Sequence, residues 1–168
     1  HLVLSAERDA SALAWESAKA RYDDALEHAG GDGVVDHEVV VEVHLARAQA
    51  MRAMGDPDYL VAMRETGRLA RAAAMADVIA QVAINSTKPG TWFANANEPD
   101  EHLIGLCEDA LAWPDLESSV RSRVLATLGT NLAFDADRPR RRAIVDEAVA
   151  LARSVGDDDL VASALIAT

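Results

Sequence analysis

The richest gathering of metal-binding side-chain types in the chain comprises Asp36, His37, Glu38, Glu42 and His44. His37 and His44 are seven residues apart, so they would share one face of a helix and could offer imidazoles to zinc or a related ion. The stretch has no H-E-x-x-H or E-x-x-H motif and no cysteine to complete a ligand set. A solvated face of a charged helix therefore explains the cluster better. An all-helical enzyme or metal protein built on the histidine and glutamate clusters stays as an alternative.

Two weaker acidic stretches have the same ordinary explanation. Glu98, Glu101 and His102 form a second small cluster of metal-type ligands, which we also interpret as a solvated helix face. The run GGDGVVDHE, from Gly30 to Glu38, superficially resembles a calcium loop. Its acidic residues miss the spacing of an EF-hand, so a plain turn is favoured. No metal or other cofactor is predicted for this chain.

Four arginines, Arg138, Arg140, Arg141 and Arg142, are suited by charge to contact a phosphate group. The alternative is a basic helix start that pairs with the acidic residues around it. Those acidic residues are Asp135, Asp137, Asp146 and Glu147. Because the chain as a whole is strongly acidic, the sequence favours structural pairing over phosphate binding.

Cys107 lies on an apolar stripe between Leu103 and Leu111, which predicts a buried packing thiol. A nucleophilic cysteine would need exposure and a neighbouring base. No arrangement of serine and histidine indicates a catalytic triad either. We therefore predict a protein that is not an enzyme.

Trp92 and Phe93 lie in the one long irregular stretch of the chain, from Asn85 to Pro99. Large aromatic side chains in loops can anchor a protein or peptide partner, so these two residues are the candidate partner-binding site. They can equally fill the gap between two helix pairs, and the sequence favours that filling role.

Charge and composition restrict the possible partners. The formal net charge is −12, which opposes direct binding to nucleic acid or to anionic membranes. No apolar run approaches the roughly 20 residues of a membrane span. A single cysteine cannot form an intrachain disulfide and fits a reducing, cytoplasmic compartment. Half of the residues are hydrophobic but only 4 % are aromatic, and the abundance of alanine favours closely packed helices.

Helical periodicity and helix-end signals predict eight helices. The clearest runs from Asp137 to Gly156: Pro139 suits its first turn, and Gly156 suits a left-handed C-cap. Asp157 then caps the next helix. The other six predicted helices span 2–29, 36–54, 57 to about 74, about 76 to 85, 98–113 and about 115–133.

An internal repeat is the most informative property of the sequence. The anchor residues Leu26, Leu69, Leu111 and Leu151 are 43, 42 and 40 residues apart. The segment after Ala70-Arg71 also resembles the segment after Ala152-Arg153 at an offset of 82 residues. This period predicts a right-handed α-solenoid of about four antiparallel helix pairs, in one domain spanning 1–168. It is TPR-like, with a period longer than the roughly 34 residues of tetratricopeptide repeats. The first helix of each pair would form the concave side.

Both ends of the sequence favour a fragment of a larger protein. The chain begins at His1 without an initiator methionine and ends in the apolar helical stretch SALIAT. A natural solenoid normally closes with a polar capping repeat. We expect Leu160–Thr168 to expose apolar surface, through which the fragment could form a homodimer.

Four segments of the chain carry a family resemblance: GTWF, PDEHLIGLCEDALAW, SSVRSRVLATLGTNL and RPRRRAIVDEAVALARSVGDDDLVASAL. Together, over roughly Met54 to Thr168, they resemble the helical-repeat region of large actinobacterial regulators, the ATPase-containing LuxR-type and related activators. The resemblance implies a parent with a nucleotide-binding module before the repeats and often a helix-turn-helix DNA reader after them. No phosphate-binding loop or DNA-reading helix occurs in this sequence, so no ATP or DNA contact is assigned to its residues.

The predicted function is accordingly protein interaction or effector sensing within a transcriptional regulator. The partner would be a protein, a peptide or a neighbouring module of the parent chain. The alternative is a stand-alone TPR-like scaffold that binds peptides or proteins.

Overall fold

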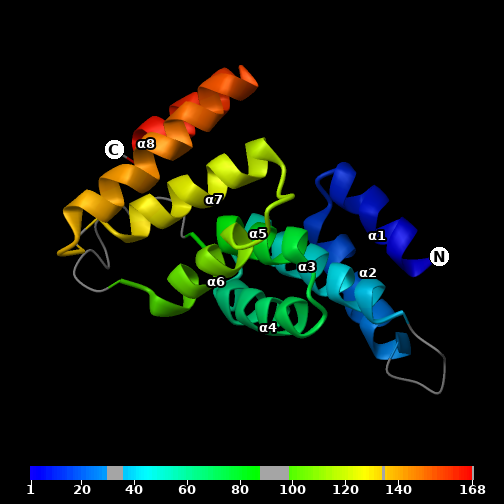
Figure 1. Cartoon of the computed structure of the whole chain (residues 1–168). Helices are drawn as coiled ribbons and strands as arrows, with labels where there is room; N and C mark the ends of the chain where they lie inside the picture. Colours follow the sequence, from blue (N-terminus) through cyan, green and yellow to red (C-terminus); the bar gives the residue numbers. More distant parts are fainter. Residues whose placement is uncertain (30–35, 88–98, 134, 168) are drawn as a thin grey trace. The chain divides into compact units, whose positions relative to one another are not determined.

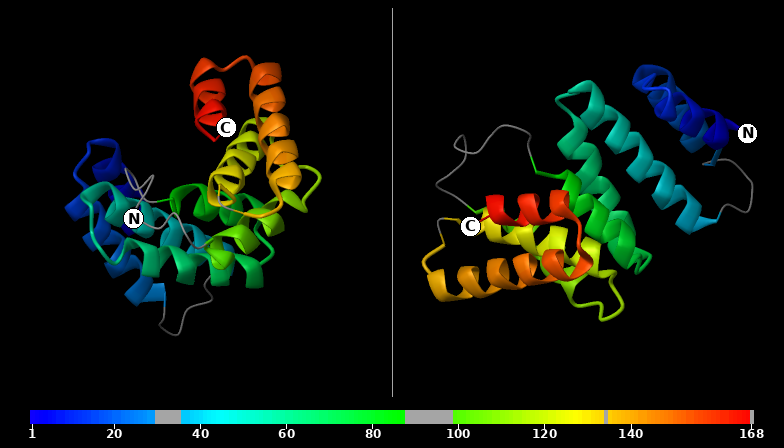
Figure 2. Two further views of the ribbon diagram at one scale, coloured as in Figure 1. Left: turned by 90° about the vertical axis from the view of Figure 1, so that its left-hand side faces the viewer. Right: turned by 90° about the horizontal axis from the view of Figure 1, so that it is seen from above.

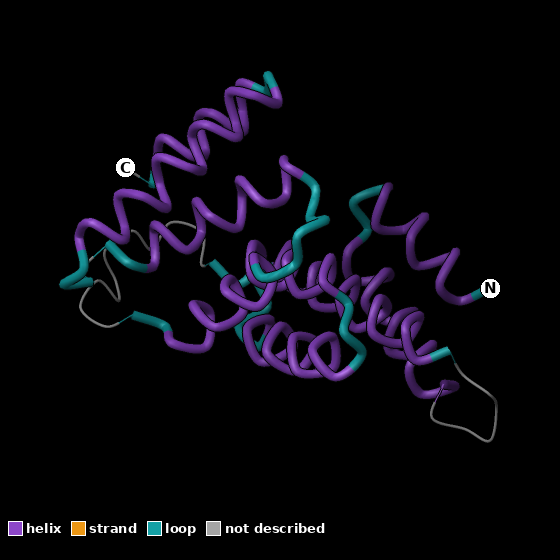
Figure 3. The backbone as a smooth tube through the Cα atoms, viewed as in Figure 1, coloured by secondary structure: helices purple, strands orange, loops and turns teal. Residues whose placement is uncertain are grey.

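The computed structural model describes residues 1–29, 36–87, 99–133 and 135–167. Within these four ranges the regular structure is entirely α-helical, with nine helices and no strand (Figures 1 and 3). The predicted all-α class is therefore confirmed. The helices are α1 (Leu2–Ser11), α2 (Trp15–Ala29), α3 (His37–Met54), α4 (Tyr59–Ala72), α5 (Ala76–Asn85), α6 (Glu101–Leu111), α7 (Ser118–Asn131), α8 (Arg138–Val155) and α9 (Asp158–Ile166).

The chain divides into two compact units, residues 1–78 and 79–168, and the division falls within α5. In the first unit, helices that follow one another pack as antiparallel neighbours: α1 with α2, α2 with α3, and α3 with α4. One core cluster of this unit comprises Ala6, Ala18, Tyr22 and Val43, so it joins α1, α2 and α3. Small alanine side chains let these helices approach closely.

The prediction of one helix from Leu2 to Ala29 is wrong. The chain breaks at Leu13, whose φ is +59°, so α1 and α2 are separate helices that pack on each other. The Leu13 amide donates to Ala10 O at 3.0 Å, and the Ala14 amide donates to Asp9 O at 2.8 Å. These two bonds form a Schellman motif, usually built on glycine. No glycine or proline marks this break, and the two helices that it separates pack on each other.

The other helix ends follow their local signals. Asp36, Asp137 and Asp157 accept hydrogen bonds from backbone amides at the starts of α3, α8 and α9, and the cap at Asp157 was predicted. Gly156 closes α8 with φ of +78°. The start predicted for the helix from 98 is corrected: α6 begins at Glu101, because the Asp100 carboxylate accepts from the amides of His102 and Leu103.

The weakly marked turn predicted near Ala74–Ala76 is confirmed. Ala74 has φ of +54°, and the Met75 amide donates to Ala70 O at 3.0 Å. Ala74 lies 82 residues before Gly156, which is the offset of the sequence repeat. The two residues therefore hold the same left-handed position after α4 and after α8, one as alanine and one as glycine.

We expect opposite stability changes when these two residues are exchanged. Gly156→Ala should lower the free energy of unfolding by about 1 kcal/mol, because a Cβ is strained in the left-handed region. No atom lies within 4 Å of the new Cβ, so backbone strain is the only cost. Ala74→Gly should raise it by about 0.5 kcal/mol, since relief of strain exceeds the extra entropy of an unfolded glycine. Urea denaturation measures both, and changes of the same sign would contradict the assignment.

In the second unit, α7 packs against three helices, namely α6, α8 and α9. Figure 2 shows α7, α8 and α9 (yellow, orange and red) lying side by side in both views. The closest packing joins α7 to α8, which the sequence placed in successive helix pairs. Their shared core with α9 comprises Leu125, Ala126, Val145, Ala148, Ala152, Leu160, Ala164 and Ala167.

The starts of α7 and α9 repeat the spacing found in the sequence. Their N-cap residues, Glu117 and Asp157, are 40 residues apart, the same step that separates Leu111 from Leu151. Val124 on α7 and Ala164 on α9 are also 40 residues apart, and both are fully buried. The starts of the two helices and one buried position in each therefore follow the 40-residue spacing of the sequence.

Candidate functional site

The histidine and acidic cluster at the start of α3 does not converge on one point. The Asp36 side chain caps the helix by accepting from the Glu38 amide at 3.0 Å. His37 is exposed and His44 is half-buried. Seven residues along a helix separate their backbones by about 10 Å. In the part of the chain that the structure describes, no group of three His, Cys, Asp or Glu side chains is placed to hold a metal.

His44 has a lowered pKa. Burial lowers the pKa of its imidazole, the nearby charge of Arg47 lowers it further, and Glu65 on α4 partly opposes both. Since the neutral imidazole is favoured in the folded state, His44 is a position where protonation works against folding.

We predict that stability contributed by His44 is present above pH 6.5 and is lost as the pH falls. Its folded pKa lies below the ordinary value of about 6.5, so below that pH the unfolded chain binds the proton more readily than the folded chain. Unfolding measured from pH 7 to pH 5 should therefore show a smaller pH dependence for His44→Gln than for the original chain. His37→Gln, an exposed position, is the matched control. An equal slope with and without His44 would contradict this assignment.

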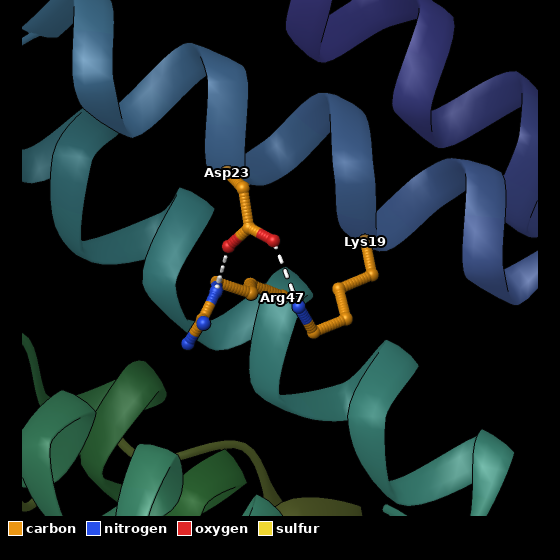
Figure 4. A network of polar contacts seen from close by, with 3 residues as sticks. All are labelled: Lys19, Asp23 and Arg47. Atoms are coloured by element: carbon orange, nitrogen blue, oxygen red, sulfur yellow. Dashed lines mark hydrogen bonds and ion pairs between the residues drawn. The ribbon is translucent and has the colours of Figure 1, made fainter.

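A three-residue ionic network joins α2 to α3 (Figure 4). Asp23 on α2 accepts from Lys19 Nζ at 2.8 Å and from Arg47 Nε on α3. Burial alone would raise the pKa of Asp23, but the hydrogen bonds and charges of Lys19 and Arg47 together lower it. The ion pairs of this network were not predicted from the sequence. The spacing of Lys19 and Asp23 on one helix face was a readable signal, whereas the contribution of Arg47 depends on packing.

Arg141 holds together the ends of two other helices in the second unit. Its Nε donates to Gly129 O in the last turn of α7 at 3.0 Å, and its Nη2 donates to Ala167 O at the end of α9 at 2.6 Å. A cation at these two C-termini also interacts favourably with both helix dipoles. Arg141 therefore stabilises the packing of α7, α8 and α9.

Arg121 on α7 plays the same part for α6. Its Nη2 donates to Leu111 O at 3.1 Å, and its Nη1 donates to Trp113 O at 3.2 Å. Its Nε also lies 3.8 Å from the carboxylate of Glu147 on α8. Arg121 thus connects three consecutive helices: it lies on α7, binds carbonyls at the end of α6 and lies near a carboxylate on α8.

Two arginines at the start of α8 form ion pairs: the partner of Arg142 is Asp146, one of the predicted residues, whereas the partner of Arg140 is Glu108, which was not among them. Arg140 Nη2 lies 2.6 Å from Glu108 Oε1 on α6. Arg142 Nε lies 3.5 Å from Asp146 Oδ2, in a pair that is mostly exposed. With Arg141 bound to backbone carbonyls, three of the four arginines have structural contacts with the protein itself.

Cys107 is fully buried in α6. Burial, with a smaller contribution from Glu108, raises the pKa of its thiol to about 12. The thiolate that nucleophilic chemistry needs is therefore disfavoured, and the predicted packing role is confirmed.

Several predicted positions lie outside the described residues, among them Trp92, Phe93, Glu98 and the glycine-rich run 30–35. Trp92 and Phe93 therefore stay predictions. Of the second acidic cluster, Glu101 is exposed and His102 is half-buried near the start of α6.

Exposed apolar side chains were expected at the end of the chain, and α9 presents two of them. Leu165 is 46 % exposed and Ile166 is 57 % exposed, whereas Leu160 is buried at 1 %. Among the described helices, none is long and apolar enough to cross a membrane.

Together these features define an all-α protein of packed antiparallel helices in which half-buried and exposed charged side chains contact helix ends and neighbouring helices. Comparison of the sequence with protein-family models, with curated proteins and with solved structures found no match.

Proposed function

We propose that this chain is a non-catalytic helical-repeat domain for protein interaction or effector sensing within a larger, cytoplasmic transcriptional regulator. The observation that supports it best is the repetition of helix position: α7 and α9 begin 40 residues apart, and Val124 and Ala164, also 40 residues apart, are both fully buried. Repeated helix pairs provide extended surfaces for partners without a dedicated catalytic site. The regulator as parent is supported by the sequence resemblance alone.

In this proposal the helix pairs stack as a right-handed, TPR-like α-solenoid. A protein, a peptide or a neighbouring module of the parent binds on the side formed by the first helix of each pair. Because each pair contacts only its neighbours, a ligand that favours one packing shifts the whole array by small additive rotations. The net charge of −12 favours such partners over direct contact with nucleic acid.

Two results would test the proposal. Intact mass and the coding frame of the native protein should reveal a phosphate-binding loop before this segment and a helix-turn-helix after it. Partner affinity should also differ between this segment and the full-length protein, because the neighbouring modules compete with the partner for one packing of the repeats. Equal affinity in the two would contradict the coupling.

The alternative is a stand-alone scaffold that uses the same repeats to hold peptides or proteins. Its support is that the sequence contains no nucleotide-binding or DNA-reading motif of its own. A coding frame with neither module on either side would favour this alternative.

A further inference from the structure

The side of α9 that faces away from the core is apolar. It presents Ala162, Leu165 and Ile166, whose spacing of three and four residues places them on one side of the helix. All three side chains are exposed. The opposite side of the same helix contributes Leu160, Ala164 and Ala167 to the core of the second unit.

The equivalent side of α7 is fully covered. At the 40-residue offset, Ala162 corresponds to Ser122, Leu165 to Leu125 and Ile166 to Ala126. Ser122 is completely buried, and Leu125 and Ala126 are 4 % and 6 % exposed. By contrast, Arg123 and Ser163, which also correspond at the 40-residue offset, are both exposed. The side formed by these three positions is therefore buried on α7 and exposed on α9.

The structure shows what covers this side of α7, namely the helix pair α8–α9. Ser122 Oγ donates to Ala148 O on α8 at 2.9 Å. Leu125 and Ala126 pack with small and β-branched side chains from both α8 and α9. One turn further along, a Cβ added to Gly129 would lie 2.5 Å from Val145, so the backbones approach closely.

We infer that the outer side of α9, formed by Ala162, Leu165 and Ile166, is a docking surface for a further helix pair built like α8–α9. The partner is a helical hairpin whose inner side carries alanine and β-branched residues and whose first helix carries an arginine like Arg141. The inference rests on the repeat architecture in the proposed function, but not on the regulator as parent.

A second copy of this chain is a poor occupant for the same surface. Three side chains on a nine-residue helix offer far less area than the roughly 800 Å² per partner of a standard interface. In addition, the α8–α9 pair of a second copy already covers its own α7. A helix pair joined in sequence needs less interface, because linkage raises its effective concentration.

A tandem extension of the chain tests this inference. Appending a copy of residues 129–168 after Thr168 continues the 40-residue step and supplies a second α8–α9 pair. Ala162→Cys and Ser163→Cys are then made separately in the original and the extended chain. Thiol labelling compares their rates, with the fully buried Cys107 as internal background.

The Ala162→Cys thiol should be labelled readily in the original chain and at least about tenfold more slowly in the extended chain, because burial excludes the reagent. The Ser163→Cys thiol should be labelled at similar rates in both, within about twofold. Equal Ala162→Cys rates in the two chains, or an extension that adds no helical circular dichroism, would overturn the inference. If labelling of the Ala162→Cys thiol in the original chain became slower at higher protein concentration, a second copy would be the occupant and the inference would be overturned. None of these outcomes bears on whether regulator modules flank the segment.

Discussion

Gly129→Ala should destabilise the protein by about 2 kcal/mol, although the same change in an isolated helix stabilises it by about 1 kcal/mol. The new Cβ would lie 2.5 Å from Val145 Cγ2, far inside van der Waals contact. Val145 is 4 % exposed and β-branched, so it has few rotamers into which to retreat. The two helices must therefore separate, which also disturbs the Arg141 hydrogen bond to Gly129 O. Urea denaturation at 25 °C measures the change.

A double-mutant cycle provides the control for this prediction. Val145→Ala alone should cost about 2 kcal/mol, because it leaves a cavity in the core of the second unit. Added to Gly129→Ala, it removes the methyl group that clashes, so the double variant should be more stable than the sum of the single changes by about 1–2 kcal/mol. Strict additivity would show that Val145 does not set the close approach of α7 and α8.

Arg141→Met should lower the free energy of unfolding by about 2–3 kcal/mol. Methionine keeps much of the aliphatic stem but removes the donors to Gly129 O and Ala167 O, which lie at the ends of two helices. Both carbonyls lose a charged partner, and both helix dipoles lose a favourable cation. Hydrogen exchange should speed up first in the last turns of α7 and α9.

Arg142→Met is the matched control, because it makes the same change of charge one residue further along α8. Its ion pair with Asp146 is exposed, with 84 % and 68 % of the two side chains accessible. We expect a change within about 0.5 kcal/mol. Equal losses at the two positions would mean that net charge, and not the hydrogen bonds of Arg141, controls stability here.

These predictions share a physical basis with the candidate surface on α9. In the second unit, side chains at a fixed position of the repeat are covered on α7 and uncovered on α9. Gly129 and Arg141 make contacts between α7 and the α8–α9 pair, and a further helix pair would make contacts of the same kind with α9. In the further inference, the helix pair that docks on α9 would make the same kind of interface that α8 and α9 make with α7.

Helix boundaries were largely readable from sequence where the signal is local. Asp36, Gly55, Gly156 and Asp157 all begin or end helices as their chemistry predicts, because caps act within one turn of the backbone. The apolar periodicity that predicted these helices also agrees with the structure: Met63, Val82, Leu106 and Val124 are all fully buried. The 40-residue spacing also appears in the helix starts.

The charged residues were harder to place from the sequence. That the arginines of α8 pair with acidic residues was expected, but the partners of Arg141 are backbone carbonyls of α7 and α9. Nothing in the neighbouring residues marks those carbonyls, since every residue has one. Arg47, whose partner Asp23 lies 24 residues earlier, is a similar case.

By itself, the sequence determined the all-α class, most of the helix ends and the 40-residue spacing, because each depends on chemistry within a few residues or on periodicity. The tertiary structure alone decided three other features. They are the break at Leu13, the close approach at Gly129, and the contrast between a covered α7 and an uncovered α9. The break at Leu13 carries neither glycine nor proline, so no residue type marks it. The other two features depend on residues that are distant in the chain and meet only when the helices pack.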